Sequence, residues 1–78
     1  MNRYVATFHT HFAAMCTHRA LTGAGLKSGL APVPRALSSS CGTCVRFTSD
    51  EPHLLLMHRD MEQLVLERAE GVYEKVSP

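Results

Sequence analysis

The chain has 78 residues, a formal net charge of +1 at pH 7 and 45% hydrophobic residues, a composition typical of one small globular domain spanning residues 1–78. With so small a net charge and no run of lysine and arginine, nothing in the sequence favours binding to nucleic acid or to an anionic membrane. No segment approaches the roughly 20 apolar residues of a membrane span, and the N-terminus lacks the apolar run of a signal peptide, so we expect a cytoplasmic protein.

The first half of the chain predicts a strand, a helix and a second strand. Aromatic and β-branched residues alternate over residues 4–8, as in a strand. An alanine-rich segment follows over residues 10–25, with Thr10 as the expected helix N-cap. Residues 26–33 are extended again, and because the prolines near their end cannot donate ladder hydrogen bonds, we expect this strand at a sheet edge.

A third strand is predicted over residues 44–48. Alternation places Val45 and Phe47 on one face of this strand and Cys44 and Arg46 on the other. The first pair is therefore expected to face the core.

The last third of the chain predicts a second helix and a fourth strand. Residues 49–61 have a serine or aspartate cap and Pro52 in the first turn, which favours a helix start. Apolar residues at helical spacing, including Leu54, Met57 and Met61, support it. A fourth strand is expected over residues 71–76.

The predicted order βαββαβ is that of the α+β, ferredoxin-like fold. Its four-stranded antiparallel sheet has the strand order 4-1-3-2, with two helices on one face and the other face open. In this topology the start of the first helix and the loop between the second and third strands lie at one end of the sheet. We therefore expect His11 near Cys41 and Cys44.

The cysteines are the most informative residues, since two of the three lie in a Cys-x-x-Cys motif, Cys41 and Cys44. In a reducing compartment such a pair is more typical of reactive or metal-binding thiols than of a disulfide framework. A nearby cation or helix N-terminus stabilises the thiolate, which is the reactive form. The third cysteine, Cys16, lies among small apolar residues of the first helix and is expected to be a buried core residue.

The neighbours of the motif suggest how a thiolate would be held. A histidine and two arginines would supply positive charge, and two serines would supply hydroxyl groups. A glycine, which has no Cβ, would let a partner approach the backbone closely. These residues are His11, Arg35, Arg46, Ser39, Ser40 and Gly42.

The five histidines raise the alternative of a zinc site completed by the two motif cysteines. A structural zinc site needs four converging ligands, and the spacing here matches no zinc-finger pattern. We expect no metal and no other cofactor.

Four segments together resemble the selenium/sulfur carrier protein-like family of small bacterial domains. They are "TFHTHFAAM", "AGL", "PVPRALSSSCGTCVRF" and "EGVY", and the resemblance extends from residue 4 to about residue 75. It implies that Cys41 bears sulfur or selenium and that the partners are proteins which donate and accept this cargo. The family's acidic residues after the Thr-His pair and in the helix are replaced here by Phe12 and Thr17.

Three functional hypotheses follow. The leading one is a carrier, without enzymatic turnover of its own, in which Cys41 accepts sulfur or selenium as a persulfide or selenosulfide and Cys44 releases it by thiol exchange. The second is a small redox protein that cycles a Cys41–Cys44 disulfide. The third is a non-catalytic module that forms a homodimer through the open sheet face.

Overall fold

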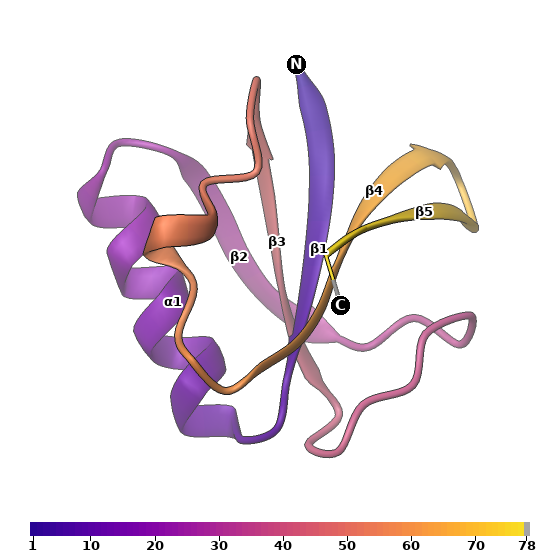
Figure 1. Ribbon diagram of the computed structural model, residues 1–78, viewed down its shortest axis with the longest axis horizontal. Coiled ribbons are helices and arrows are strands. Elements are labelled where there is room, and N and C mark those ends of the chain that lie inside the picture. The colour runs from indigo at the N-terminus through magenta and orange to yellow at the C-terminus, as the bar shows by residue number, and fades with distance from the viewer. Residues whose placement is uncertain (78) are drawn as a thin grey trace.

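The computed structural model describes residues 1–77, in which one helix covers one face of a five-stranded antiparallel sheet (Figure 1). The sheet has the strand order β2-β3-β1-β4-β5. The elements in chain order are β1 (Asn2–Phe8), α1 (His11–Gly23), β2 (Lys27–Pro32), β3 (Thr43–Ser49), the 3₁₀ turn η1 (Leu54–Leu56), β4 (Met61–Ala69) and β5 (Val72–Ser77).

Strand β1 is the centre of the fold. All its residues from Tyr4 to Phe8 are buried, on both faces of the sheet. Buried backbone groups must be hydrogen-bonded, so a strand buried in this way requires a partner on each edge. Antiparallel pairing with β3 on one side and β4 on the other provides these partners.

Helix α1 begins and ends at the signals that the sequence predicts. The Thr10 side chain accepts a hydrogen bond from the backbone N–H of Ala13 at 3.1 Å, which caps the first turn. Beyond the last turn, Gly25 has a φ of +84°, a left-handed conformation that glycine adopts without strain. The predicted first helix and its N-cap are thus confirmed.

The main core lies between α1 and the sheet. It contains aromatic and aliphatic side chains from three strands together with small residues of the helix, which allow the helix to approach closely. Its buried members are Tyr4, Ala6, Phe8, Ala13, Ala14, Leu21, Val45, Phe47 and Leu64. Val45 and Phe47 therefore face the core, as their alternation predicts.

The predicted second helix over residues 49–61 is wrong. Only Leu54–Leu56 form a single 3₁₀ turn, after His53 in a left-handed conformation with a φ of +53°. A helix with an apolar face should bury its leucines, yet Leu55 is fully exposed. The apolar spacing that favoured this helix continues into β4, where it belongs to a strand buried on both faces.

The ferredoxin-like assignment is therefore also wrong. The described residues contain one helix and five strands, not two helices and a four-stranded 4-1-3-2 sheet. The place beside β1 that the prediction gave to residues 71–76 is taken by β4, and β5 lies outside β4 at the edge. The edge position predicted for β2 is confirmed, since β2 pairs only with β3 within residues 1–77.

The sheet face opposite α1 is not bare. A second small cluster of Val5, Cys44 and Val65 lies on it, covered by partly buried side chains of the β2–β3 loop and β5. The rest of this face carries charged groups such as Arg46 and Glu67. A homodimer through an open apolar face, which remains a prediction, would have little uncovered apolar surface to use there.

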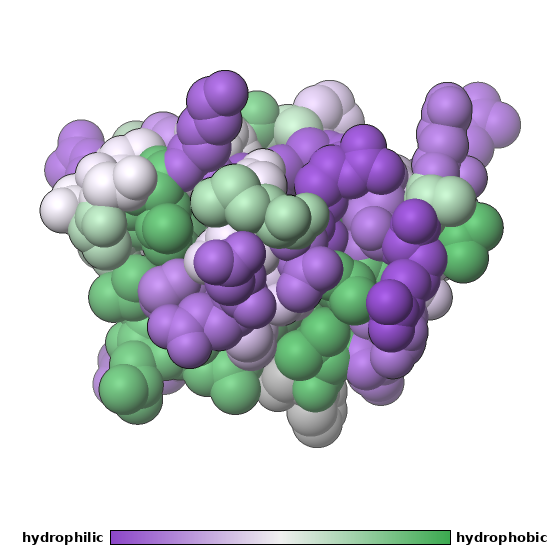
Figure 2. Space-filling model, turned by 90° about the horizontal axis from the view of Figure 1, so that it is seen from above, coloured by the Kyte–Doolittle hydropathy of each residue, from purple (hydrophilic) through white to green (hydrophobic). Residues whose placement is uncertain are grey.

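The end of the molecule seen from above carries mostly hydrophilic side chains across its middle, with apolar side chains toward its lower margin (Figure 2).

Within the described residues, the only α-helix is too short to cross a lipid bilayer.

Candidate functional site

The loop of residues 33–42 joins β2 to β3 and contains Cys41, the first cysteine of the motif. Its base is closed by the Pro32–Thr43 pair of the ladder and by a hydrogen bond from Val33 N–H to Gly42 O at 3.1 Å. Gly42 has a φ of +76°, which a residue with a Cβ rarely adopts. The loop therefore turns sharply into β3 directly after Cys41.

Cys41 lies on this turn and is partly exposed. Its thiol donates a hydrogen bond to the Thr43 carbonyl at 3.5 Å, and its backbone N–H donates to Ser39 Oγ at 3.4 Å. Both bonds are local and involve weak or long contacts, so the sulfur is accessible to a second molecule without unfolding of the sheet.

Side-chain hydrogen bonds attach the loop segment before Cys41 to the central strands. Ser39 Oγ donates to the Phe8 carbonyl at 3.2 Å. The Ser40 hydroxyl donates to Glu62 Oε2 at 2.7 Å, and its backbone N–H reaches the same oxygen at 3.2 Å. A further bond runs from Gln63 Nε2 to the Ser38 carbonyl at 3.3 Å. The loop is thus held to β1 and β4 by the residues directly before Cys41.

Glu62 is the residue on which these contacts converge. Its carboxylate also lies 3.3 Å from Nδ1 of His9. Burial alone would raise the pKa of the Glu62 carboxyl, but the hydrogen bonds from Ser40 and the charge of His9 outweigh it and hold the pKa below its ordinary value. The charged form of Glu62 is the one that anchors the loop.

Cys44 differs from Cys41 in every relevant respect. It is fully buried in β3, in the cluster with Val5 and Val65, and its thiol donates to the Pro32 carbonyl at 3.5 Å. Burial raises the pKa of the Cys44 thiol above its ordinary value, although Arg46 opposes this shift. A buried neutral thiol is a poor nucleophile, so this position favours a structural role.

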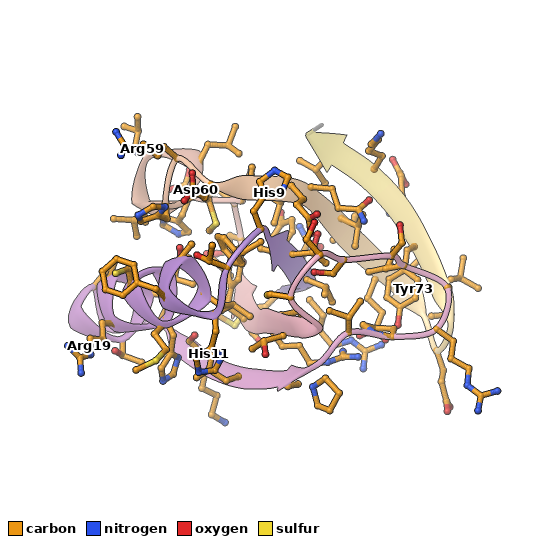
Figure 3. The ribbon with its side chains drawn as sticks, turned by 90° about the horizontal axis from the view of Figure 1, so that it is seen from below. His9, His11, Arg19, Arg59, Asp60 and Tyr73 are labelled. Carbon is orange, nitrogen blue, oxygen red and sulfur yellow. The ribbon has the colours of Figure 1, made fainter. Side chains whose placement is uncertain are left out.

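His11 lies at the same end of the sheet as the cysteine loop, as the sequence predicts. Its Nδ1 is 3.2 Å from Oγ1 of Thr43, the residue whose carbonyl accepts the Cys41 thiol. Thr43 therefore connects the start of α1 to Cys41. Figure 3 shows the rings of His9 and His11 apart from each other, on different sides of the helix start.

The two arginines occupy different places. Arg35 is exposed at the corner of a turn closed by a hydrogen bond from Leu37 N–H to Pro34 O at 3.0 Å, and among residues 1–77 its guanidinium has no ion pair. Arg46 forms an ion pair with Glu67 at 3.3 Å, on the sheet face beyond Cys44. Within residues 1–77, neither arginine forms a hydrogen bond with Cys41.

Cys16 is half-buried rather than fully buried, and it is not a member of either core cluster. As for metals, no group of three or more His, Cys, Asp or Glu side chains in the described part of the chain is arranged to hold an ion.

Sequence reasoning missed Glu62 and Thr43, and it considered His9 only among the histidines that could bind zinc. Thr43 lies between the two motif cysteines, and this position was the one available signal for it. Glu62 gave no such signal, because the scattered glutamates are typical of a solvated surface. Only the pairing of β4 with β1 brings Glu62 to the loop.

The model of a family described as "Putative Se/S carrier protein-like" matches residues 3–69 of the chain. No curated protein and no solved structure matches the chain.

Proposed function

Because the chain belongs to the family described as "Putative Se/S carrier protein-like", we propose that it carries sulfur or selenium as a single atom bound to Cys41. The observation that carries the choice of residue is the contrast between the two motif cysteines: Cys41 is partly exposed on an anchored turn, and Cys44 is buried in a strand. Cytoplasm, where thiols stay reduced, is the proposed compartment.

Loading is a thiol exchange without net oxidation. The Cys41 thiolate attacks the outer sulfur of a donor persulfide, R–S–SH, and a new S–S bond forms between Cys41 Sγ and that sulfur. The donor's own S–S bond breaks, and the donor leaves as a thiolate that takes up the proton lost by Cys41. Selenium in the outer position gives a selenosulfide by the same exchange.

Release requires a thiol from outside the protein. Cys44 was the expected resolving residue, but its burial and raised pKa argue against an attack on the Cys41 cargo. The acceptor's thiolate therefore attacks the outer sulfur, and Cys41 leaves as the thiolate. One cysteine is sufficient for both half-reactions.

The surrounding residues position the sulfur. Ser39 and Ser40 fix the loop to β1 and β4, and Gly42 allows the turn that presents Cys41. His11, bonded to Thr43, would place a positive charge near the thiolate when it is protonated. Arg35, exposed on the same loop, is free to contact a partner protein's acidic groups.

The experiment is intact-mass measurement after incubation with glutathione persulfide, on wild type and on Cys16→Ser, Cys41→Ser and Cys44→Ser. We expect the mass of one added sulfur on every protein except Cys41→Ser. Equal loading of Cys41→Ser and wild type would contradict the proposal. Loss of two hydrogens without added sulfur would instead identify a Cys41–Cys44 redox cycle.

A further inference from the structure

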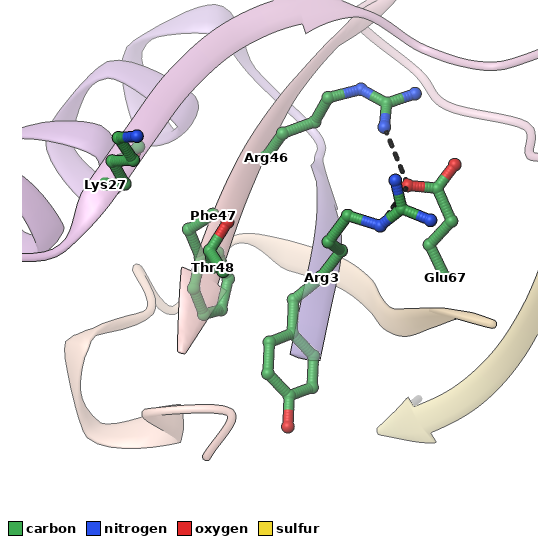
Figure 4. A pocket seen from close by; sticks show the side chains of 8 residues that line it. Arg3, Lys27, Arg46, Phe47, Thr48 and Glu67 are labelled. Atoms are coloured by element: carbon green, nitrogen blue, oxygen red, sulfur yellow. Dashed lines mark hydrogen bonds and ion pairs between the residues drawn. The ribbon is translucent and has the colours of Figure 1, made fainter. Parts of the chain in front are cut away.

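A hollow of about 340 Å³ lies on the sheet face opposite α1, at the end of β1 remote from the cysteine loop. Polar lining residues come from four neighbouring strands, as Figure 4 shows for most of them. The side chains on this face are Arg3 on β1, Lys27 on β2, Arg46 and Thr48 on β3, and Glu67 on β4. Its size is at the small end of the range of small-molecule sites.

The strand register explains why these groups meet. Thr48 is paired with Lys27 on one side and with Arg3 on the other, and Arg3 is paired in turn with Glu67. Directly paired residues project to the same face of a sheet. Gly29, which is paired with Arg46, adds no side chain, and a Cβ placed there would meet nothing within 4 Å.

The charges in the hollow do not balance. A single oxygen, Oε1 of Glu67, serves both arginines, at 3.3 Å from Arg46 Nη1 and 3.8 Å from Arg3 Nε. The Glu67 side chain is only 10% exposed, whereas those of Arg3 and Arg46 are 61% and 41% exposed. A single carboxylate oxygen accepts from only some of the N–H donors of the two guanidiniums, and both side chains remain open to solvent. Within residues 1–77, Lys27 has no ion pair.

Three cations thus face one carboxylate, which leaves an excess of two positive charges. Guanidinium groups present planar pairs of N–H donors that match the oxygens of phosphate, sulfate and carboxylate groups. The Thr48 hydroxyl, between Lys27 and Arg3 in the row, adds a neutral donor. Glu67 holds the two like-charged guanidiniums side by side, so that little reorganisation is needed on binding.

We propose that this hollow binds a small dianion, of the phosphate, sulfate or dicarboxylate kind, between Lys27 and the Arg3–Arg46 pair. The site is separate from Cys41 and does not depend on the carrier function. Its position at the other end of the sheet leaves the cysteine loop open while the anion is bound.

The test is titration of the full chain with inorganic phosphate, sulfate and succinate, followed by amide chemical shifts, at constant ionic strength maintained with sodium chloride. We expect saturable shifts centred on Arg3, Lys27, Arg46 and Thr48. Acetate, a monoanion, should bind at least about tenfold more weakly. The order among the three dianions identifies the kind of group that the site prefers.

Substitutions in the hollow should change the affinity for the dianion in opposite directions, depending on the charge that they remove. Arg46→Gln or Lys27→Gln should weaken binding by about tenfold, the loss expected for one charge-assisted contact. Glu67→Gln should tighten binding, because the amide keeps an oxygen that can accept hydrogen bonds from the two guanidiniums but removes the competing negative charge. Arg19→Gln, at an exposed position on α1, makes the same charge change outside the hollow and should have no effect.

Equal weakening by Arg46→Gln and Arg19→Gln would overturn the site, since it would indicate only a net-charge effect. Weaker binding in Glu67→Gln, or equal binding of acetate and the dianions, would overturn it as well. Lys27 lies on an exposed edge strand, so Lys27→Gln decides the matter even if Arg46→Gln fails to fold.

Discussion

The two motif cysteines have different surroundings because strand β3 begins between them. Cys41 precedes Gly42 and its positive φ, on a turn, while Cys44 is already paired with β1 and β2. Pairing on both edges places Cys44 in the interior of the sheet. Burial then removes both the exposure and the thiolate character that a nucleophile needs.

This contrast predicts the alkylation rates. Iodoacetamide at pH 8 should modify Cys41 at least about a hundredfold faster than Cys44, since Cys44 reacts only after a local opening of about 3 kcal/mol. Half-buried Cys16 should lie between them. Peptide mapping by mass spectrometry at timed intervals gives the three rates. Comparable rates for Cys41 and Cys44 would contradict the burial on which their roles depend.

Glu62 predicts how stability responds to acid. Because its folded-state pKa lies below the ordinary value, the carboxylate contributes fully above the unfolded-state pKa, and this contribution is lost as the pH falls through the lowered value. Glu62→Gln should therefore cost about 1 kcal/mol of unfolding free energy at pH 7 and much less at pH 3. Urea denaturation at both pH values measures it.

The matched control is Glu70→Gln, an exposed glutamate in the β4–β5 turn that has no hydrogen bond or ion pair in the described part of the chain. A loss in Glu70→Gln as large as that in Glu62→Gln would mean that net charge, and not the Ser40 contacts, sets the effect.

Among the elements, β4 is the one that local sequence could not identify. Leu64, Val65 and Leu66 are consecutive apolar residues, which a strand buried on both faces and a buried helix share. The choice between strand and helix depends on a non-local contact. The edge of β1 that β3 does not occupy needs a partner strand, and β4 provides it. The other strands and α1 were predictable because each carries its own signal, such as the Thr10 cap or the alternation of Val45 and Phe47.

The candidate site was predictable to a similar extent. Cys41 and His11 could be placed at one end of the sheet, because the β1–α1 connection and the β2–β3 loop lie there in any sheet with β3 between β1 and β2. Glu62 could not be placed, since its position depends on β4. The burial of Cys44 also depends on a covering layer, which alternation along one strand does not reveal.

The position of β4 predicts two unequal leucine substitutions. Leu64→Ala should lower the unfolding free energy by about 2–4 kcal/mol, because Leu64 is fully buried between the sheet and α1. Leu55→Ala, at a fully exposed position of η1, should change it by less than about 0.5 kcal/mol. Chemical denaturation of the two variants measures the difference. The reverse order would contradict the burial of Leu64 against α1 and the exposure of Leu55.

On the scale of the whole molecule, α1 covers one face of the sheet, and the β2–β3 loop with β5 covers the part of the other face around Val5 and Cys44. Val33, Leu37 and Tyr73 pack over Val5 and Cys44. Figure 3 shows Tyr73 within the bend of the loop. The first part of the loop, with Val33 and Leu37, thus shields Cys44, and the last part presents Cys41.

Removing part of this cover should expose the buried thiol. Leu37→Ala is expected to raise the alkylation rate of Cys44 by about tenfold, through more frequent local opening, without changing that of Cys41. Leu30→Ala, which removes the same atoms from a partly exposed position outside this cluster, is the control. An unchanged Cys44 rate in Leu37→Ala would mean that the loop does not shield it.

The most direct test of the central claim is sulfur transfer by a protein that retains Cys41 alone, with Cys16→Ser and Cys44→Ala. After loading from glutathione persulfide and removal of the donor, an acceptor thiol is added and the masses of both molecules are followed. The account predicts that this variant gains one sulfur and passes it on at close to the wild-type rate, since one cysteine performs both exchanges. If the variant fails to load, or loads and cannot release without Cys44, the single-cysteine carrier is contradicted.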